Sequence, residues 1–392
     1  MLQKGGNGIE STDTAKKDKG KKVSVITMHN YPNYGSILQA FAAQEKLKEF
    51  ASEVEIIDYS GGSSTLGRSF FAYLALQFRL NPLKALLGLP IRLRKRMVYD
   101  RFAGRYLNLT AERYTTAEDF MKFPFHDGYY CTGSDQVWNP FFTENEPFFL
   151  NFVPDDKKKF GLSVSIGNYL EEKLNPDEAD KIKKYVSRYE YISVREERGL
   201  KLLSGQLDYP DAIQLVDPTV AMPPEFWREF APESRIKGEY ILVYKLGKES
   251  AFEALSKEIS KRTGLPLVRF CNQSFGQVIS GAGKKVIMPR IFRLITLIDN
   301  AKYLITDSFH GTALAMNLNT EPVVYREEYD GERISGFLRM LGYEHRYLKS
   351  INDPDIIDIP VDFDHVNEVL ARERVRVDEF LCKVFQVPSQ DR

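Results

Sequence analysis

The chain has little cysteine, no excess of either charge and no long apolar run. Its three cysteines, Cys131, Cys271 and Cys382, are far apart and form no CxxC pair. We therefore expect neither a disulfide framework nor a zinc site, and a reducing compartment is favoured. Lys+Arg and Asp+Glu both number 54, which argues against a protein whose main partner is nucleic acid. No stretch reaches the ~18 apolar residues of a membrane span and no signal peptide is recognisable, so a cytoplasmic protein is expected.

The length of 392 residues is more than one ordinary core accommodates, and the composition is that of a globular protein. Residues 1–21 are polar and rich in Gly, Lys and Asp, which predicts a disordered segment. We then expect an N-terminal α/β domain at 22–230, a C-terminal α/β domain at 231–360 and a C-terminal helix at 361–392. A proline-rich stretch marks the linker between the two domains.

Both predicted domains alternate apolar strand patterns with helical patterns. In the first, KVSVITMHN, a helical pattern at 36–50 and VEIIDYS follow one another, which indicates a βαβ unit and a parallel sheet. In the second, YILVYKLGK, LPLVRF, AKYLIT and PVVY are separated by helical patterns. The fold class is therefore predicted as two doubly wound, Rossmann-like domains that face a cleft.

The segment 70–106 departs from this alternation. Two apolar helical stretches are expected to break at Pro82 and Pro90, and a basic helix with Arg92, Arg94, Lys95, Arg96 and Arg101 follows. One interpretation is a helical excursion packed on the sheet. The other is a membrane-surface element, because aromatic and aliphatic residues interleave with the basic ones.

Among the loops that follow strands, TDSFHGT gives the clearest prediction of a binding site. It lies between the strand AKYLIT and a helix, so backbone N–H groups and the helix dipole point at any anion bound there. We predict that Ser308, His310, Gly311 and Thr312 line an anion site, with His310 able to transfer a proton. The alternative is that Asp307 or Ser308 only caps the helix and His310 is structural.

Arginines follow other strands at the same edge. Arg195 follows YISV, Arg326 follows PVVY, and Arg333 lies in the loop beyond. Arginine binds phosphate and carboxylate in a bidentate manner, so these residues predict an anion-binding cleft. The alternative for Arg195 is a surface salt bridge to Glu196 or Glu197.

Several of these loops together resemble the polysaccharide pyruvyl transferase family. The resemblance rests on HNYPNYGSILQAFAAQ, GSDQVWNP, SVREERGLKLL, VDPT, TDSFHGTALAMN and ERISGFLRMLGYEHRYL, in that order between about Val23 and Leu348. One departure is GLSVSIG at 161–167, where the family more often has an aromatic residue and two alanines. We expect this difference to alter packing rather than chemistry.

The resemblance implies a fold similar to GT-B glycosyltransferases and a reaction between phosphoenolpyruvate and a saccharide. The pyruvyl group would join two sugar hydroxyls as a cyclic ketal, on a lipid-linked precursor of a capsule or exopolysaccharide. The family's donor-binding role falls on His310, Arg195 and, more loosely, Arg326. Phosphoenolpyruvate is a co-substrate, and neither a further cofactor nor a metal is expected.

The chemistry of such a transfer assigns further roles. His310 is the candidate to donate a proton or stabilise the leaving phosphate, on the C-terminal donor side. Asp135 is the candidate to orient or deprotonate the acceptor hydroxyl on the N-terminal side, unless it only binds loop N–H groups. Trp138 either stacks on a sugar or is a buried anchor. Asn33 and Tyr34 are further acceptor-binding candidates.

Two other functions are compatible with these residues. A nucleotide-sugar-dependent GT-B glycosyltransferase would also need an anion site in its donor cleft. A non-catalytic sugar-binding protein would bind the sugar without catalysing any reaction. For the transferase, a lipid-linked acceptor would place the protein at the inner face of the cytoplasmic membrane, in peripheral contact through 70–106.

Overall fold

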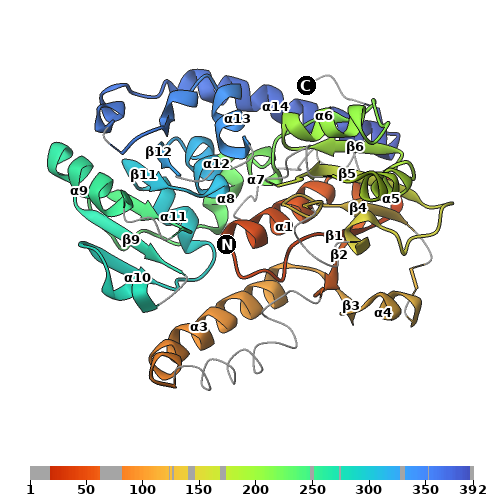
Figure 1. Cartoon of the computed structure of the whole chain (residues 1–392), viewed down its shortest axis with the longest axis horizontal. Coiled ribbons are helices and arrows are strands. Elements are labelled where there is room, and N and C mark those ends of the chain that lie inside the picture. Colours follow the sequence, from red (N-terminus) through yellow and green to blue (C-terminus); the bar gives the residue numbers. More distant parts are fainter. Residues whose placement is uncertain are drawn as a thin grey trace, which may run out of the picture.

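The computed structural model describes residues 18–61, 82–122, 124–125, 128–139, 146–167, 174–247, 251–272, 275–326, 332–351 and 353–388. Its strands form two separate sheets, which lie side by side with helices on their faces (Figure 1). All strand pairs in both sheets are parallel. The predicted fold class of two doubly wound domains is therefore confirmed.

The first sheet belongs to the N-terminal half and has the strand order β3-β2-β1-β4-β5-β6-β7. Its strands are β1 (Asp18–Ile26), β2 (Ala51–Tyr59), β3 (Leu109–Tyr114), β4 (Tyr129–Thr132), β5 (Lys158–Val164), β6 (Tyr191–Val194) and β7 (Ile213–Gln214). The order reverses between β1 and β4, and such a reversal is where ligands bind in open α/β sheets.

The second sheet has the order β10-β9-β8-β11-β12-β13 and the same kind of reversal, between β8 and β11. Its strands are β8 (Ile241–Tyr244), β9 (Leu267–Cys271), β10 (Lys284–Ile287), β11 (Tyr303–Thr306), β12 (Glu321–Tyr325) and β13 (Tyr347–Leu348). The predicted boundary at residue 230 falls between the strands of the two sheets. The strands β3, β10 and β13 were not anticipated from the sequence, because each is short or largely polar.

The helices connect and cover these strands. In the N-terminal half they are α1 (Tyr34–Leu47), α3 (Pro82–Tyr106), α4 (Ala117–Lys122), α5 (Pro176–Val186) and α6 (Glu197–Gly205), and α7 (Pro218–Ala221) and α8 (Pro224–Phe230) follow β7. In the C-terminal half they are α9 (Ala251–Thr263), α10 (Phe275–Ile279), α11 (Arg293–Asp299), α12 (Phe309–Asn317), α13 (Arg333–Met340) and α14 (Phe363–Phe385). Short 3-10 turns occupy Glu146–Phe149, Glu344–Arg346 and Pro354–Asp358.

Helix α1 is buried on almost every side because it lies between the two halves (Figure 1). Phe41 packs against Phe102 of α3, Trp227 of α8 and Phe292 at the start of α11. One hydrophobic cluster therefore contains residues of both halves. The burial of this shared apolar surface holds the two domains together.

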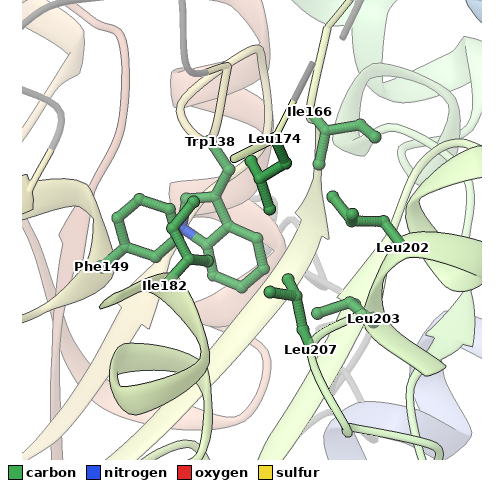
Figure 2. Close-up of a pocket in the computed structure, with 8 residues that line it drawn as sticks. All are labelled: Trp138, Phe149, Ile166, Leu174, Ile182, Leu202, Leu203 and Leu207. Carbon is green, nitrogen blue, oxygen red and sulfur yellow. The ribbon is translucent and has the colours of Figure 1, made fainter. Parts of the chain in front are cut away.

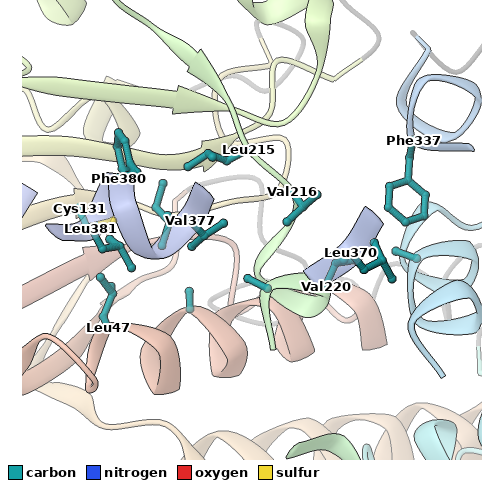
Figure 3. Packing of buried hydrophobic residues seen from close by; sticks show 14 of the residues in the cluster. Leu47, Cys131, Leu215, Val216, Val220, Phe337, Leu370, Val377, Phe380 and Leu381 are labelled. Atoms are coloured by element: carbon teal, nitrogen blue, oxygen red, sulfur yellow. The ribbon is translucent and has the colours of Figure 1, made fainter. Parts of the chain in front are cut away.

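Helix α14, which lies within the predicted C-terminal helix at 361–392, packs against the N-terminal sheet. Phe385 contacts the rings of Phe50 and Phe160, and Lys46 of α1 pairs with Asp378 at 2.5 Å. Figure 3 shows Val377, Phe380 and Leu381 of α14 gathered around Leu47 and Cys131. The chain thus ends by crossing back to the half in which it began.

The predicted start of the ordered chain is corrected. Strand β1 begins at Asp18 rather than after residue 21, because Asp18 already pairs with Ala51 of β2. Further along the strand, Lys22 pairs with Glu53 and Glu55 at 3.3 and 3.0 Å. Residues 1–17 of the predicted disordered segment lie outside the described residues.

The predicted helix break at Pro90 is wrong, because α3 runs through this proline. A proline inside a helix removes one backbone hydrogen bond. Tyr99 and Phe102 are buried in the core and anchor the later turns of the same helix. Residues 70–81 of the predicted segment lie outside the described residues. No helix in the described part of the chain is long and apolar enough to cross a membrane.

Candidate active site

Three charged residues follow strands of the first sheet at its carboxyl edge. Asp135 lies in the loop after β4, Arg195 comes directly after β6, and Asp217 follows β7 as the N-cap of α7. Their exposed fractions are 5%, 6% and 1%. Buried charges are costly unless they are paired, so this edge must hold them in a defined arrangement.

Asp217 is the centre of that arrangement. One carboxylate oxygen, Oδ1, accepts hydrogen bonds from the backbone N–H and the hydroxyl of Thr219, at 2.9 and 2.6 Å. The other, Oδ2, accepts from Nη1 of Arg195 at 2.7 Å and from Oγ of Ser134 at 2.9 Å. Both oxygens are therefore fully engaged, and Asp217 positions Arg195.

His310 reaches the same carboxylate from the C-terminal half. It lies in the first turn of α12, and its Nε2 is 3.5 Å from Oδ2 of Asp217, the distance of an ion pair rather than of a good hydrogen bond. The first turn of α1 packs against the imidazole, since a Cβ atom on Gly35 would lie 2.3 Å from its Nδ1. The N-termini of α1 and α12 thus meet at His310.

The pKa of Asp217 reflects these contacts. Burial alone would raise the pKa of the carboxyl group, but His310, Arg195 and the Thr219 hydrogen bond outweigh burial and hold the pKa far below its ordinary value. The Asp217 side chain is therefore ionised at neutral pH.

Arg195 is enclosed by acidic and aromatic groups. Its Nε donates to Oε1 of Glu196 at 3.1 Å, and its guanidinium carbon lies 4.1 Å from the centre of the Phe309 ring. Burial would lower the pKa of Arg195, but Glu196, Asp217 and Asp135 raise it above its ordinary value. The predicted alternative of a surface salt bridge to Glu196 or Glu197 is corrected, because the pair with Glu196 is buried.

Asp135 is tied to both its own loop and α1. Its carboxylate accepts hydrogen bonds from Oγ of Ser36 and, at 3.0 Å, from the backbone N–H of Gln136. Its φ of 71° lies in the left-handed region, so tertiary contacts hold this loop in an uncommon conformation.

These charged residues from the two halves form one buried group, which we call the junction cluster: Asp135, Arg195, Glu196, Asp217 and His310.

Three other predicted donor-site residues, Ser308, Gly311 and Thr312, mostly make contacts that stabilise α12 itself. Oγ of Ser308 caps the helix by accepting from the backbone N–H of Gly311 at 3.2 Å, and Thr312 donates its hydroxyl to the Ser308 carbonyl at 3.0 Å. A Cβ atom on Gly311 would meet Thr306 and Tyr244 at 3.0 and 3.1 Å, so this glycine permits close packing within the domain.

Arg326 follows β12 and is half-buried, next to residues 327–331, which lie outside the described residues. The N–H groups of Gly311 and Thr312 are used within the first turn of α12, so the His310 side chain and the N–H groups of Phe309 and His310 are the donors of TDSFHGT that remain for an anion.

Two predicted acceptor-binding residues are placed in the core. Tyr34 is fully buried, packs against Tyr99 and Phe270, and donates its hydroxyl to the Pro289 carbonyl. Trp138 stacks on Phe149 and lines an apolar cavity of only about 10 Å³ (Figure 2).

These two placements correct the acceptor-binding predictions and favour the buried-anchor alternative for Trp138, because neither side chain faces a space that admits a sugar. Asn33 is half-buried and caps α1 by accepting from the backbone N–H of Gly35 at 2.8 Å.

A pocket of about 190 Å³ opens beside the junction cluster, between the turn after β6 and helix α13. The N-terminal half lines it with Arg195, Glu196 and Gln214, and α13 lines it with Arg333, Phe337 and Met340. Arg195 and Arg333, from different halves of the chain, therefore line the same pocket.

Sequence reasoning gave no role to Asp217 or Gly35. The N-cap pattern Asp-Pro-Thr and the position of Gly35 each indicate the start of a helix. Neither pattern indicates which distant side chain contacts that residue in the folded protein.

In the described part of the chain, no group of three or more His, Cys, Asp or Glu residues is arranged to hold a metal ion.

Comparison with solved structures finds partial similarity at low sequence identity. UDP-N-acetylglucosamine 2-epimerase from Rickettsia bellii is 12% identical with a TM-score of 0.48, over 93% of this chain and 97% of its own. UDP-GlcNAc 2-epimerase from Methanocaldococcus jannaschii, in complex with UDP-GlcNAc and UDP, is 14% identical with a TM-score of 0.49, over 90% and 94%. A mutant O-GlcNAc transferase from Thermobaculum terrenum is 12% identical with a TM-score of 0.43, over 93% and 64%. Likeness at this level says nothing about the reaction.

Comparison with protein families gives a more specific result than comparison with individual proteins. A search of curated proteins by sequence finds no match. The family model for polysaccharide pyruvyl transferase, in contrast, matches residues 33–329, a range that contains every residue of the junction cluster. The chain therefore belongs to the polysaccharide pyruvyl transferase family.

Proposed function

We propose that this enzyme transfers the enolpyruvyl group of phosphoenolpyruvate to two hydroxyls of a sugar, giving a cyclic pyruvate ketal. The acceptor is a lipid-linked precursor of a capsular or exopolysaccharide. Family membership supports a pyruvyl transfer in general. The observation that carries the proposal is the meeting of Arg195 and His310, from different halves of the chain, at the buried carboxylate of Asp217.

The reaction needs a proton donor and a site for a strongly anionic substrate. The methylene carbon of the donor takes up a proton and becomes a methyl group, while the adjacent C2 becomes cationic. A sugar hydroxyl bonds to C2 and loses its proton, the C–O bond to phosphate breaks with its electron pair leaving on phosphate, and a second hydroxyl bonds to the same carbon and loses its proton. The products are the ketal and inorganic phosphate.

His310 and the start of α12 suit the donor half of this reaction. Nε2 of His310 has no hydrogen-bond partner among the described residues and lies 3.5 Å from Oδ2 of Asp217. A histidine side chain can donate a proton near neutral pH, so His310 is suited to protonate the methylene carbon of the donor. The first N–H groups of α12 provide an anion site for the phosphate. Arg195 adds a fixed positive charge that stabilises the charge developing on the leaving group.

Calorimetric titration with phosphoenolpyruvate, without added metal, tests the donor. Saturable binding followed by phosphate release in the presence of lipid-linked or nucleotide-linked hexoses supports the proposal, and NMR of the product identifies the ketal. No binding at millimolar donor with acceptor present contradicts it. Tight binding of UDP or GDP without binding of phosphoenolpyruvate would instead favour a glycosyltransferase, and sugar binding without any turnover would favour a non-catalytic protein.

Helix α3 supports the proposed lipid-linked acceptor and a peripheral contact with the inner face of the cytoplasmic membrane. Leu86, Leu93 and Met97 are 58%, 47% and 47% exposed and recur at helical spacing. The exposed residues Arg94, Arg101 and Arg105 form a second stripe with the same spacing, which we call the basic face of α3. Adjacent apolar and basic stripes are typical of helices that lie on anionic membranes.

A further inference from the structure

Glu196 leaves one buried oxygen without a hydrogen bond at the edge of the pocket beside α13. Its Oε1 accepts from Oγ of Ser165 at 2.6 Å and from Nε of Arg195 at 3.1 Å. Its Oε2 has no partner among the described residues, although the side chain is only 2% exposed. Nη2 of the neighbouring Arg195 is likewise without a partner in that part of the chain. The pair thus offers a ligand one acceptor and one donor.

The chemistry of these two atoms selects the ligand. A carboxylate or a fully ionised phosphate has only acceptor oxygens, so it can satisfy Nη2 of Arg195 but not Oε2 of Glu196. A hydroxyl group both donates and accepts. Two neighbouring hydroxyls satisfy both atoms at once, with one donating to Glu196 and the other accepting from Arg195.

The rest of the pocket agrees with a neutral ligand. Its lining contains the cations Arg195, Arg333 and Arg339 and the anions Glu196, Glu197 and Glu332, so neither sign is in excess. Phe337 and Met340 give it an apolar wall, against which the C–H face of a sugar can pack. Its volume of about 190 Å³ corresponds to roughly six water molecules, which suits one sugar ring rather than an oligosaccharide.

We propose that this pocket binds the terminal sugar of the acceptor, with Glu196 and Arg195 holding the two hydroxyls that form the ketal. The inference rests on the proposed function, because ketal formation requires two hydroxyls presented together. It moves the acceptor site from Tyr34 and Trp138, which are buried in the core, to the pocket that Arg195 and Glu196 line together with α13.

Gly336 of α13 offers a way to fill the pocket without substituting any residue of the junction cluster. It lines the pocket, and a Cβ atom built on it meets nothing within 4 Å. Gly336→Leu should therefore place a side chain in the pocket, and leucine is the better helix former. Gly104→Leu is the matched control, since Gly104 is an exposed helical glycine of α3 with nothing within 4 Å of its Cβ position.

Saturation-transfer NMR with the methyl glycosides of glucose, galactose and mannose, without phosphoenolpyruvate, measures sugar binding independently of turnover. We expect at least one glycoside to bind the wild type, and Gly336→Leu to weaken that binding at least about tenfold while Gly104→Leu does not. Deoxy derivatives of that glycoside should lose affinity when either hydroxyl of one neighbouring pair is missing.

The outcomes separate this inference from the proposed function. Sugar binding that depends on Gly336, without any binding of phosphoenolpyruvate, supports the sugar site and contradicts the pyruvyl transfer. The inference is overturned if none of the glycosides binds, if Gly336→Leu and Gly104→Leu bind sugar equally, or if Gly336→Leu weakens binding of phosphoenolpyruvate but not of sugar.

Discussion

The junction cluster and the basic face of α3 both use arginine, but in opposite surroundings. Arg195 is 6% exposed and contacts two carboxylates, whereas Arg94, Arg101 and Arg105 are exposed to solvent. Charges in a buried site interact strongly and are hardly screened, while exposed charges interact weakly and are screened by salt. Changes in the cluster should therefore affect stability and turnover, and changes on the exposed faces of α3 should cost little stability and mainly affect weak, salt-dependent association.

The largest effect is expected for Asp217→Asn, which leaves Arg195 buried without its main partner. Removing one partner of a buried ion pair costs about 3–5 kcal/mol of the free energy of unfolding. Urea denaturation measures this cost, and Asp217→Glu, which keeps the charge, is the control.

The pH dependence gives a second test of Asp217. Because the pKa of Asp217 is lowered in the folded protein, its carboxylate stabilises the fold above the ordinary Asp pKa of about 3.9. The difference in stability between wild type and Asp217→Asn should therefore be full at neutral pH and shrink as the pH falls below that value. A difference that grows towards acid would contradict this assignment.

The next largest effect is expected in turnover. His310→Gln removes the proton donor, and Arg195→Lys keeps a charge but cannot reach Asp217, Glu196 and a ligand together. Each variant should lower turnover at least about 100-fold, the scale of losing one general acid or one transition-state donor. Circular dichroism must show a folded protein, and full activity in either variant would remove that residue from the mechanism.

A smaller effect is expected when Arg94, Arg101 and Arg105 are changed together to Gln. Each contributes roughly 1 kcal/mol at an anionic surface before screening, so binding to anionic vesicles at moderate salt should fall about tenfold. Co-sedimentation measures the loss. Changing the exposed residues Arg235, Lys237 and Lys284 to Gln is the charge-matched control. If the wild-type protein does not sediment with vesicles, the proposed membrane role of α3 is wrong.

The smallest effect is expected for Asp100→Asn on α3. Asp100 pairs with Arg96 at 3.3 Å with an exposed fraction of 62%, and such pairs contribute about 0.3–0.5 kcal/mol. Urea denaturation should show a loss of this size or less. A loss comparable to that of Asp217→Asn would contradict the contrast between the two regions.

Much of the fold could be predicted from local patterns. Apolar runs such as ILVY at β8 and YLIT at β11 are fully buried strands, as a parallel sheet covered on both faces requires. The same reasoning located Arg195 and His310, because each directly follows a strand or begins the helix after it. The apolar stripe of α14 was recognisable, but its packing against the distant N-terminal sheet was not.

The errors concern residues whose local pattern allows two environments. Tyr34 and Trp138 have amphipathic side chains that serve equally in a core or at a sugar site, and the choice depends on neighbours such as Phe270 and Phe149. The proline in α3 was overestimated as a helix breaker, because tertiary contacts anchor the turns on its C-terminal side.

The sequence by itself determined the two parallel sheets, the loops at their carboxyl edges and the candidates His310 and Arg195. These follow from periodicity and from the chemistry of strand-to-helix turns, which are local properties. Only the tertiary structure decided that Asp217 joins these two residues and that Glu196 faces a pocket closed by α13. The reason is physical: burial and pairing of charges depend on which segments pack together, and here α1, α7 and α12 meet from distant parts of the chain.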